Sequence, residues 1–374
     1  MRPVHVLIFH ATAPCDAGTL ARALAEARRA IAERQLAGFL AAGADSAEIV
    51  AGPPDRLSFG ERLATALRAR GAESGMIGGV VVLGSGSIPL AHAADLRRFV
   101  DVAEGPGGHG LANNRYSADV VAVSRAADLA GLPPLPADNA LPRWLEERVG
   151  VAVTDLRQHW RLGVDVDTPL DLILLGDAAL RRPRASATLL GERLDTPLLG
   201  ERLAELANVM SNRRAELVVA GRISASTLAW LERGVACRIR ALVEERGLRA
   251  ASRLAQSGTT GSPRPPHSVL GLLLDRDGPE SLASTVAGLA DAAVIDTRVL
   301  IAHRAGADDS RWPEPEDRYA SDLLLPASIA DPWLRALTVS ATEAPSGGSI
   351  LLGGHTLVNG GLRLIAERAR ARAR

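Results

Sequence analysis

Two aspartates near the middle of the chain are the residues best suited to chemistry. Asp165 and Asp167 stand in the segment 163–170 (GVDVDTPL), directly before an expected helix. Carboxylates are ligands that Mg²⁺ prefers, and a bound Mg²⁺ stabilises the charge that collects on phosphoryl oxygens during transfer. The pair is therefore a candidate for a catalytic and metal-binding role.

Small and polar residues flank two other expected strands of the first half. They are Gly84, Ser85, Gly86 and Ser87 after the run 80–83, and Asn113, Asn114 and Arg115 ahead of the run 120–123. The first group could expose backbone amides to a phosphate, or it could form only a tight turn. The second could contact a base or a phosphate, or it could be a surface turn. We predict both as nucleotide-binding segments and leave the structural alternatives open.

The second half carries its own candidate site. Two glycine pairs flank His355 and Asn359 in the segment 353–361 (GGHTLVNGG), which follows an expected strand and precedes a helix. Such a backbone could approach an anion, or it could be a packed turn. If the ends of the neighbouring strands converge, the polar cleft would contain Asp296, Arg298, His303, Asp322, His355 and Asn359.

Short β-branched runs alternate with Ala/Leu/Arg-rich stretches, which is typical of a mostly parallel sheet covered by helices. The expected strands are 4–9, 37–41, 47–50, 80–83, 120–123 and 151–153 in the first half, and 216–220, 269–274, 293–295 and 349–352 in the second. The expected helices of the first half are 18–33, 59–70, 93–102 and 141–148, with another starting at Leu170.

The length of 374 residues predicts two α/β domains. We place the first at 1–180, an Arg/Pro/Ser/Thr-rich linker at 181–197, and a second α/β domain of unknown role at 198–374. The polar, Pro/Gly-rich insert 256–267 is expected to be a surface loop.

The composition excludes several classes of protein. Basic and acidic residues balance at 43 each, which argues against a protein that coats nucleic acid. The sequence contains no lysine, so Schiff-base and P-loop lysine mechanisms are excluded. Its two cysteines are too far apart for a CxxC motif. The sequence contains no run of about 18 apolar residues, so it predicts no membrane-spanning helix. We therefore expect a cytoplasmic protein that contacts neither nucleic acid nor membrane, and an oligomer remains open.

Four segments of the first half, taken in order, resemble the nucleotidyltransferase superfamily with the glycosyltransferase-A fold. They are 9–18 (FHATAPCDAG), 59–62 (FGER), 81–90 (VVLGSGSIPL) and 163–172 (GVDVDTPLDL). The superfamily includes the molybdenum-cofactor and phospholactate guanylyltransferases and related bacterial glycosyltransferases. The resemblance covers about half of the chain, and its most specific element is the terminal D-x-D-T-P-x-D-L.

The resemblance implies a Rossmann-like sheet that holds an NTP across the carboxyl ends of its strands, with Mg²⁺ bridging the phosphates. It implies transfer of a nucleotidyl group to a small phosphorylated or hydroxylated acceptor. The sequence departs from the family in its opening loop 10–18, which has no basic residue, and in the loop 84–87, which has no aspartate. It departs again at Asn113, where related glycosyltransferases have an acidic segment. Two alternatives therefore stay open: a non-catalytic nucleotide-binding or scaffold protein, and a glycosyltransferase that uses a sugar nucleotide.

Overall fold

The computed structural model describes residues 3–53, 57–70, 78–135, 140–176, 197–245, 267–344 and 348–372. These residues form two compact units. The first holds the described residues up to Ala17 and those from Arg22 to Val166; the second holds Gly18–Ala21, Asp167–Gly176 and the described residues from Pro197 onward. The predicted linker, apart from Pro197, and the predicted insert 256–267, apart from His267, lie outside the described residues. No helix in the described part of the chain has the length and apolar character needed to cross a membrane.

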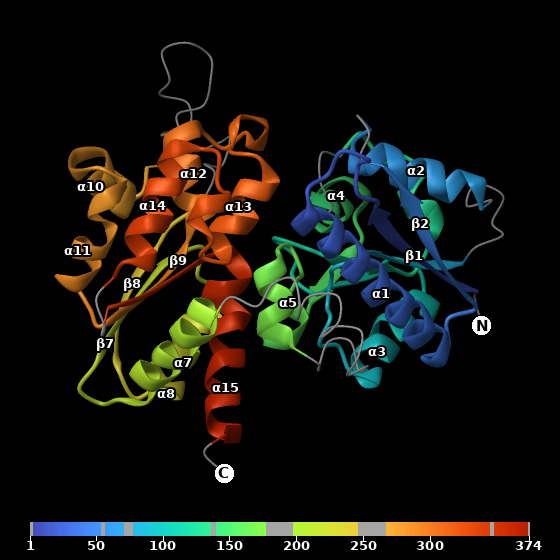
Figure 1. Ribbon diagram of the computed structural model, residues 1–374. Coiled ribbons are helices and arrows are strands. Elements are labelled where there is room, and N and C mark those ends of the chain that lie inside the picture. Colours follow the sequence, from blue (N-terminus) through green and yellow to red (C-terminus); the bar gives the residue numbers. More distant parts are fainter. Residues whose placement is uncertain are drawn as a thin grey trace. The chain divides into compact units, whose positions relative to one another are not determined.

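The first unit alternates strands with helices (Figure 1). Its strands are β1 (Val4–Ala11), β2 (Ser46–Gly52), β3 (Gly79–Gly84), β4 (His109–Ala112), β5 (Val120–Val123) and β6 (Ala152–Asp155). Its helices are α1 (Thr19–Ala41), α2 (Phe59–Ala69), α3 (Ala93–Glu104), α4 (Leu141–Trp144), the π-helical segment η4 (Leu145–Val149), and the 3₁₀ segments η2 (Ala126–Leu129) and η5 (Trp160–Gly163).

The first sheet has the strand order β2-β1-β3-β5-β4-β6, in which β5 is antiparallel to both of its neighbours. Side chains alternate across it, as the period of two in a strand requires. Val6 and Ile8 of β1 pack in one core with helices α1 and α3, whereas Leu7 packs in a second core with helices α2 and α4. Helices therefore cover both faces, and the polar groups collect at the strand ends.

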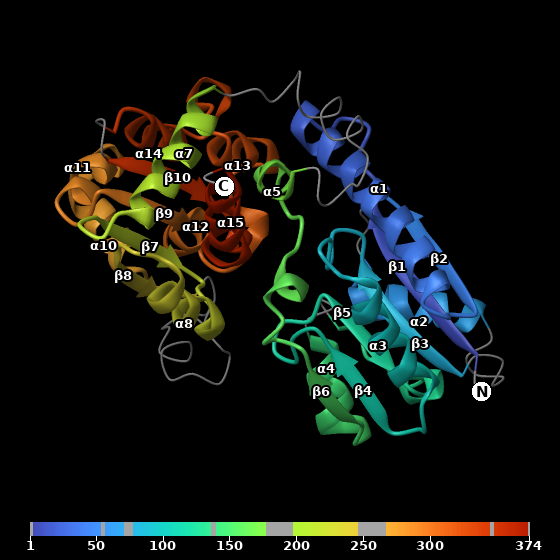
Figure 2. The same ribbon diagram turned by 90° about the horizontal axis from the view of Figure 1, so that it is seen from below.

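The second unit also alternates strands with helices, around a smaller sheet (Figure 2). Its strands are β7 (Glu216–Gly221), β8 (Arg238–Val243), β9 (Ala292–Asp296) and β10 (Ser349–Gly353). Its helices are α5 (Pro169–Leu175), α7 (Pro197–Ser211), α8 (Ala225–Gly234), α10 (Val269–Asp277), α11 (Leu282–Ala287), α12 (Thr297–Ala305), α13 (Pro315–Asp322), α14 (Pro332–Thr342) and α15 (Leu362–Arg372). The short helical segments are η7 (Pro279–Ser281), η8 (Asp309–Arg311), η9 (Pro326–Ser328) and the π-helical η10 (Leu357–Gly361).

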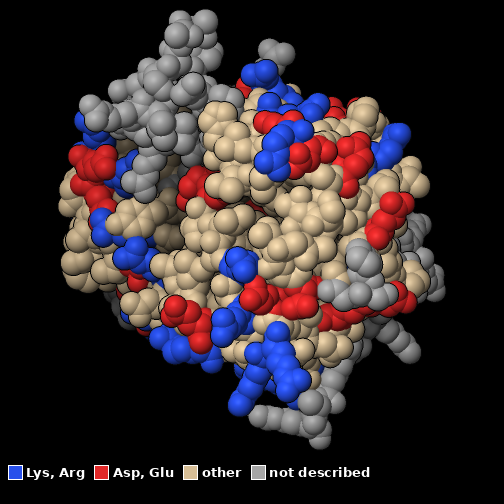
Figure 3. All heavy atoms as spheres, turned by 90° about the vertical axis from the view of Figure 1, so that its left-hand side faces the viewer, with Lys and Arg blue, Asp and Glu red and all other residues tan. Residues whose placement is uncertain are grey.

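All pairings in the second sheet are parallel, in the order β10-β9-β7-β8. Both units are thus mixed layers of helices and mainly parallel strands, which confirms the predicted α/β class with a Rossmann-like first unit. Basic and acidic side chains stand interspersed on the face shown in Figure 3, in keeping with the net charge of zero.

Two expected strands are helical. Residues 37–41 form the last turn of α1, because the Ala/Leu-rich stretch before them has high helix propensity and simply continues. Residues 269–274 lie in α10, where Ser268 caps the helix through Gly271 and the buried Leu270 and Leu274 are four residues apart. Strands β4 and β8 were not expected from the sequence. The first is only four residues long, and the second is an edge strand with mostly exposed or half-buried side chains.

Candidate functional site

Strands β1 and β3 end side by side at the carboxyl edge of the first sheet. They pair in parallel with Phe9 opposite Gly84, and the N–H of Ser85 donates to the Phe9 carbonyl over 2.9 Å. The Ser85 hydroxyl lies 3.1 Å from Nδ1 of His10, and both side chains are buried. A hydroxyl–imidazole pair therefore stands at the edge where open α/β sheets bind ligands.

Two arginines of helix α1 supply positive charge to this edge. Burial lowers the pKa of His10, and the charges of Arg29 and Arg28 lower it further, so the imidazole is neutral at pH 7. Arg28 also donates from Nε to the carbonyl of Val166 over 2.6 Å. The opening loop 10–18 has no basic residue, as noted above, but the helix that follows it provides two.

The loop 84–87 is tied down by the segment that contains Asp165. The N–H of Val166 donates to the Gly86 carbonyl over 3.1 Å, and Ser87 forms a β-bridge with Asp165. A Cβ on Gly86 would lie 2.7 Å from the Val166 carbonyl oxygen, so only glycine fits there. Buried Ile88 follows with φ at +44°, a left-handed conformation that is rare for β-branched residues and that clusters at functional sites. The loop is therefore a tight turn as well as a candidate phosphate contact.

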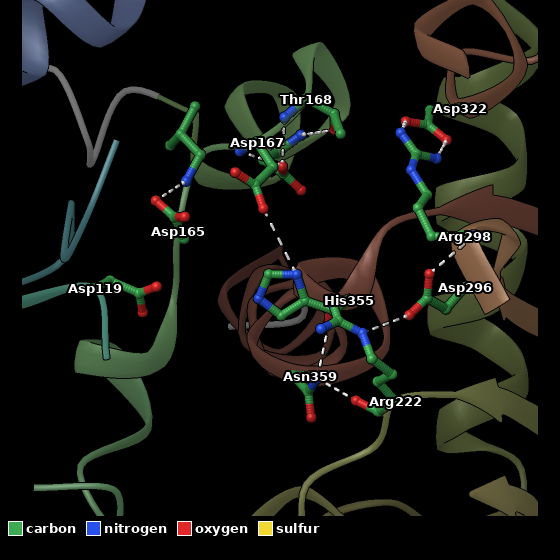
Figure 4. A network of polar contacts seen from close by, with 12 residues as sticks. Asp119, Asp165, Asp167, Thr168, Arg222, Asp296, Arg298, Asp322, His355 and Asn359 are labelled. Atoms are coloured by element: carbon green, nitrogen blue, oxygen red, sulfur yellow. Dashed lines mark hydrogen bonds and ion pairs between the residues drawn. The ribbon is translucent and has the colours of Figure 1, made fainter. Parts of the chain in front are cut away.

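Asp165 and Asp167 have different partners. Asp165 accepts the N–H of Val166 over 2.8 Å, whereas the carboxylate of Asp167 lies 3.7 Å from Nδ1 of His355 (Figure 4). Val166 is the last residue of its stretch of the first unit, and Asp167 belongs to the second. No group of three or more His, Cys, Asp or Glu side chains that could hold a metal occurs among the described residues. The predicted magnesium site stays a prediction.

The predicted segment Asn113–Arg115 uses its side chains internally. Asn113 is buried; its Nδ2 donates to Asp119 over 2.8 Å and to the Leu162 carbonyl over 2.9 Å. Asn114 accepts the N–H of Tyr116 in an Asx turn, and Arg115 forms an ion pair with Glu146. This loop is positioned against the first candidate segment, because the N–H of Gly84 donates to the Asp119 carbonyl. These residues thus shape the loop, and the side chain that they present is Tyr116.

Tyr116 borders a pocket of about 330 Å³ in the first unit. Its ring is exposed and lies under the guanidinium groups of Arg115 and Arg157, at 5.5 and 5.3 Å from the ring centroid. The pocket is lined by Tyr116, Leu135, Ala140, Arg143, Trp144, Glu147 and Arg148. Its helical wall includes the π-helical segment η4, a geometry that is frequent at functional sites. The aromatic rings of Tyr116 and Trp144, together with Arg143 and Arg148, suit an anionic ligand that has an apolar body.

The second-unit candidates separate into groups. Arg298 is buried and binds Asp322 with both terminal nitrogens, and its backbone N–H donates to Asp296 over 3.1 Å. His303 lies elsewhere: Nδ1 accepts the N–H of Ser268 over 3.0 Å, and Nε2 contacts Asp275 at 2.9 Å. The expected cleft therefore does not include His303, whose two nitrogens contact the N-cap and the last turn of α10.

Asn359 is also committed internally, so it is not the ligand-facing donor that we expected. Its Oδ1 accepts the N–H of Ser224 over 2.8 Å, and its Nδ2 donates to the carbonyls of Arg222 and His355 over 2.9 and 2.8 Å. The side chain joins the loops that follow β7 and β10. His355 remains half-buried beside Asp167.

Comparison with solved structures gives likenesses in fold, one of which is distant in sequence. A solved structure from Desulfovibrio desulfuricans G20, of a protein proposed to be a nucleotide-diphospho-sugar transferase, has 17% sequence identity and a TM-score of 0.37. The match covers 51% of this chain and 95% of that chain. No family model and no curated protein matches the sequence.

Sequence reasoning missed the basic residues of the first unit's edge. Arg28 and Arg29 sit in the middle of a helix that reads as an ordinary Ala/Arg-rich stretch, and their approach to His10 depends on how α1 packs. Tyr116 carried a usable signal, because one of only two tyrosines stands in a loop beside an arginine. Arg222 was also missed, although it directly follows a predicted strand.

Proposed function

We propose that the chain is a nucleotide-dependent transferase. The first unit binds the phosphates of an NTP at the carboxyl edge of β1 and β3, and the enzyme transfers a nucleotidyl group to a small phosphorylated or hydroxylated acceptor. The observation that carries this proposal is the position of Arg28, whose Nε lies against Gly86, 3.2 Å from where a Cβ on that residue would be, in the loop that carries Ser85 of the His10–Ser85 pair. The resemblance of four sequence segments to nucleotidyltransferases supports the same assignment.

The chemistry of this edge suits phosphate. Arginine guanidinium groups bind phosphoryl oxygens through charge-assisted hydrogen bonds, and the Ser85 hydroxyl adds a donor. His10 is neutral at pH 7 and can donate or accept one hydrogen bond without adding charge. These groups would bind and orient the donor, while Asp165 stands at the rim of the same loop.

The pocket beside Tyr116 is the proposed place for the acceptor. It lies in the same unit, and its loop contacts the loop 84–87 through Asp119 and Gly84. Arg143 and Arg148 would bind a phosphate or carboxylate of the acceptor, and Trp144 would contact its apolar part.

Two alternatives can be separated by their products. Nucleotidyl transfer from an NTP releases pyrophosphate, whereas glycosyl transfer from a sugar nucleotide releases a nucleoside diphosphate. Binding without transfer would release neither product. Product analysis with each NTP and sugar nucleotide, with and without Mg²⁺, distinguishes all three.

We predict that Arg28→Gln weakens nucleotide binding about tenfold or more, since a lost charge-assisted contact is worth roughly 1.5–3 kcal/mol. Isothermal titration calorimetry with the nucleotide that the product analysis identifies as the donor measures the change in affinity. Arg29→Gln is a second test, because Arg29 is exposed and pairs with Glu33 rather than with Val166. Arg98→Gln, an exposed position on α3, is the control and should bind as the parent does. Equal affinity in all three variants would place the nucleotide elsewhere.

A further inference from the structure

The second sheet has a point where its chain connections change direction. From β7 the chain moves to β8 on one side, and it then returns to β9 on the other side of β7. Loops that leave two neighbouring strands in opposite directions leave a crevice at the carboxyl ends, where open α/β sheets bind ligands. Arg222 directly follows β7, and Asp296 is the last residue of β9.

Arg222 and Asp296 face each other at this point with unused hydrogen-bonding atoms (Figure 4). Nε of Arg222 lies 3.6 Å from Oδ2 of Asp296, and both atoms are buried without a hydrogen bond. The Asp296 side chain is fully buried, and that of Arg222 is 20% exposed. Within the described part of the chain, Asp296 is the side chain with which the Arg222 guanidinium forms an ion pair. The Asp296 contact engages Nε, so the terminal nitrogens of the guanidinium are not used by this ion pair.

The loop that carries Arg222 is held in a fixed shape. Asn359 binds it at two points, by donating to the Arg222 carbonyl and by accepting the N–H of Ser224. Asn359 itself lies in the π-helical segment η10, a geometry that is frequent at functional sites. Gly221 has φ at +132°, and a Cβ there would meet that of Asp296 at 2.3 Å. Arg222 is therefore presented in one position, which lowers the entropic cost of binding a ligand.

The local charges favour an oxyanion. Asp296 holds one edge of the Arg222 guanidinium by charge attraction. The negative charge of Asp296 is compensated by Arg222 and by the backbone N–H of Arg298. The N-terminus of the ten-residue helix α8, capped by Ser224, adds a partial positive charge two residues beyond Arg222. A guanidinium that is held on one edge offers its other donors to the paired oxygens of a phosphate or carboxylate.

We propose that the second unit binds a small molecule through a phosphate or carboxylate group at Arg222. This site is separate from the nucleotide site proposed for the first unit, and it replaces the wider cleft that the sequence suggested. The backbone carbonyls of His355 and Arg222 both accept from the Asn359 amide, so the loops after β10 and β7 meet at this site.

Calorimetric titration of the full chain with inorganic phosphate and, separately, with succinate tests the proposal. The titrations use the Arg28→Gln background, so that phosphate binding by the first unit does not obscure the result. We expect saturable binding of at least one probe, and the stronger probe identifies whether the natural ligand presents phosphate or carboxylate. Arg222→Gln should weaken that binding about tenfold or more, and Arg222→Lys should restore only part of it, because lysine lacks the paired donors.

Two controls make the outcome decisive. Arg233→Gln removes an exposed arginine of the same unit and should leave binding unchanged. Arg222→Gln in the otherwise unchanged chain should leave nucleotide binding by the first unit intact, so the two proposals can fail separately. The inference is overturned if neither probe binds saturably, if Arg222→Gln binds as well as the background, or if Arg233→Gln loses as much as Arg222→Gln. Equal melting temperatures of the variants exclude unfolding as the cause of a loss.

Discussion

Replacing Asp322 with alanine is expected to lower the free energy of unfolding by about 3–5 kcal/mol, because it leaves a buried guanidinium without its counter-ion. Arg298 and Asp322 are buried and form a two-point ion pair between α12 and α13, with one N–O distance of 2.7 Å. Burial lowers the pKa of Arg298, but the carboxylate of Asp322 raises it by more, so the arginine stays charged. Urea unfolding followed by circular dichroism measures the loss.

A matched pair of variants tests the cause. The double variant Arg298→Met with Asp322→Leu removes both charges and should recover most of the lost stability, since two apolar side chains of similar size can replace a buried pair. Asp277→Ala breaks the exposed Arg276–Asp277 pair and should have little effect. If Asp322→Ala is no more harmful than Asp277→Ala, the buried pair is not what holds α12 to α13.

The sequence predicts a strand or helix correctly where its hydrophobic pattern and its residue types favour the same structure. Strands such as β3 and β9 are short apolar runs that are buried on both faces, and their valine and isoleucine residues favour a strand. The segment 269–274 is equally apolar, yet it is helical because Ser268 caps it and its burial follows a helical period. A short apolar run is ambiguous between strand and helix, and only flanking caps and packing decide it.

The candidate sites were harder to predict, because the role of a polar side chain depends on partners that are distant in the sequence. Asn113 and Asn359 have the residue type of a ligand contact, but the amide groups of both are occupied by hydrogen bonds within the protein. Arg28 lies 138 residues from the Val166 carbonyl that it binds. Strand alternation places residues two apart on the same face, so it would have put Asp165 and Asp167 together. The structure instead gives them different partners, Val166 and His355. A sequence pattern does not show which of two neighbouring polar side chains is available to bind a ligand.

Asp171 should give the second unit an unusual dependence of stability on pH. This carboxyl is fully buried in α5; one oxygen accepts the N–H groups of Asp167 and Thr168, and the other is buried without a hydrogen bond. Burial raises its pKa from 3.8 to about 7, with a further contribution from the charge of Asp167. The folded protein therefore holds this proton at a pH where the unfolded chain has already released it.

The sign follows from proton binding. Because the folded pKa lies above the unfolded one, the stabilisation is fully present below about pH 4 and is lost as pH rises to about 7 and beyond. The free energy of unfolding of the unmodified chain should thus fall, relative to Asp171→Asn, by about 3 kcal/mol between about pH 4 and about pH 8. Asparagine keeps an acceptor for the two N–H groups, so its own packing cost is a constant offset and only the slope with pH carries the test. Glu147→Gln, at an exposed position, is the control and should run parallel to the parent. Parallel curves for Asp171→Asn and the parent over this range would mean that Asp171 ionises in the folded state as an ordinary surface aspartate does.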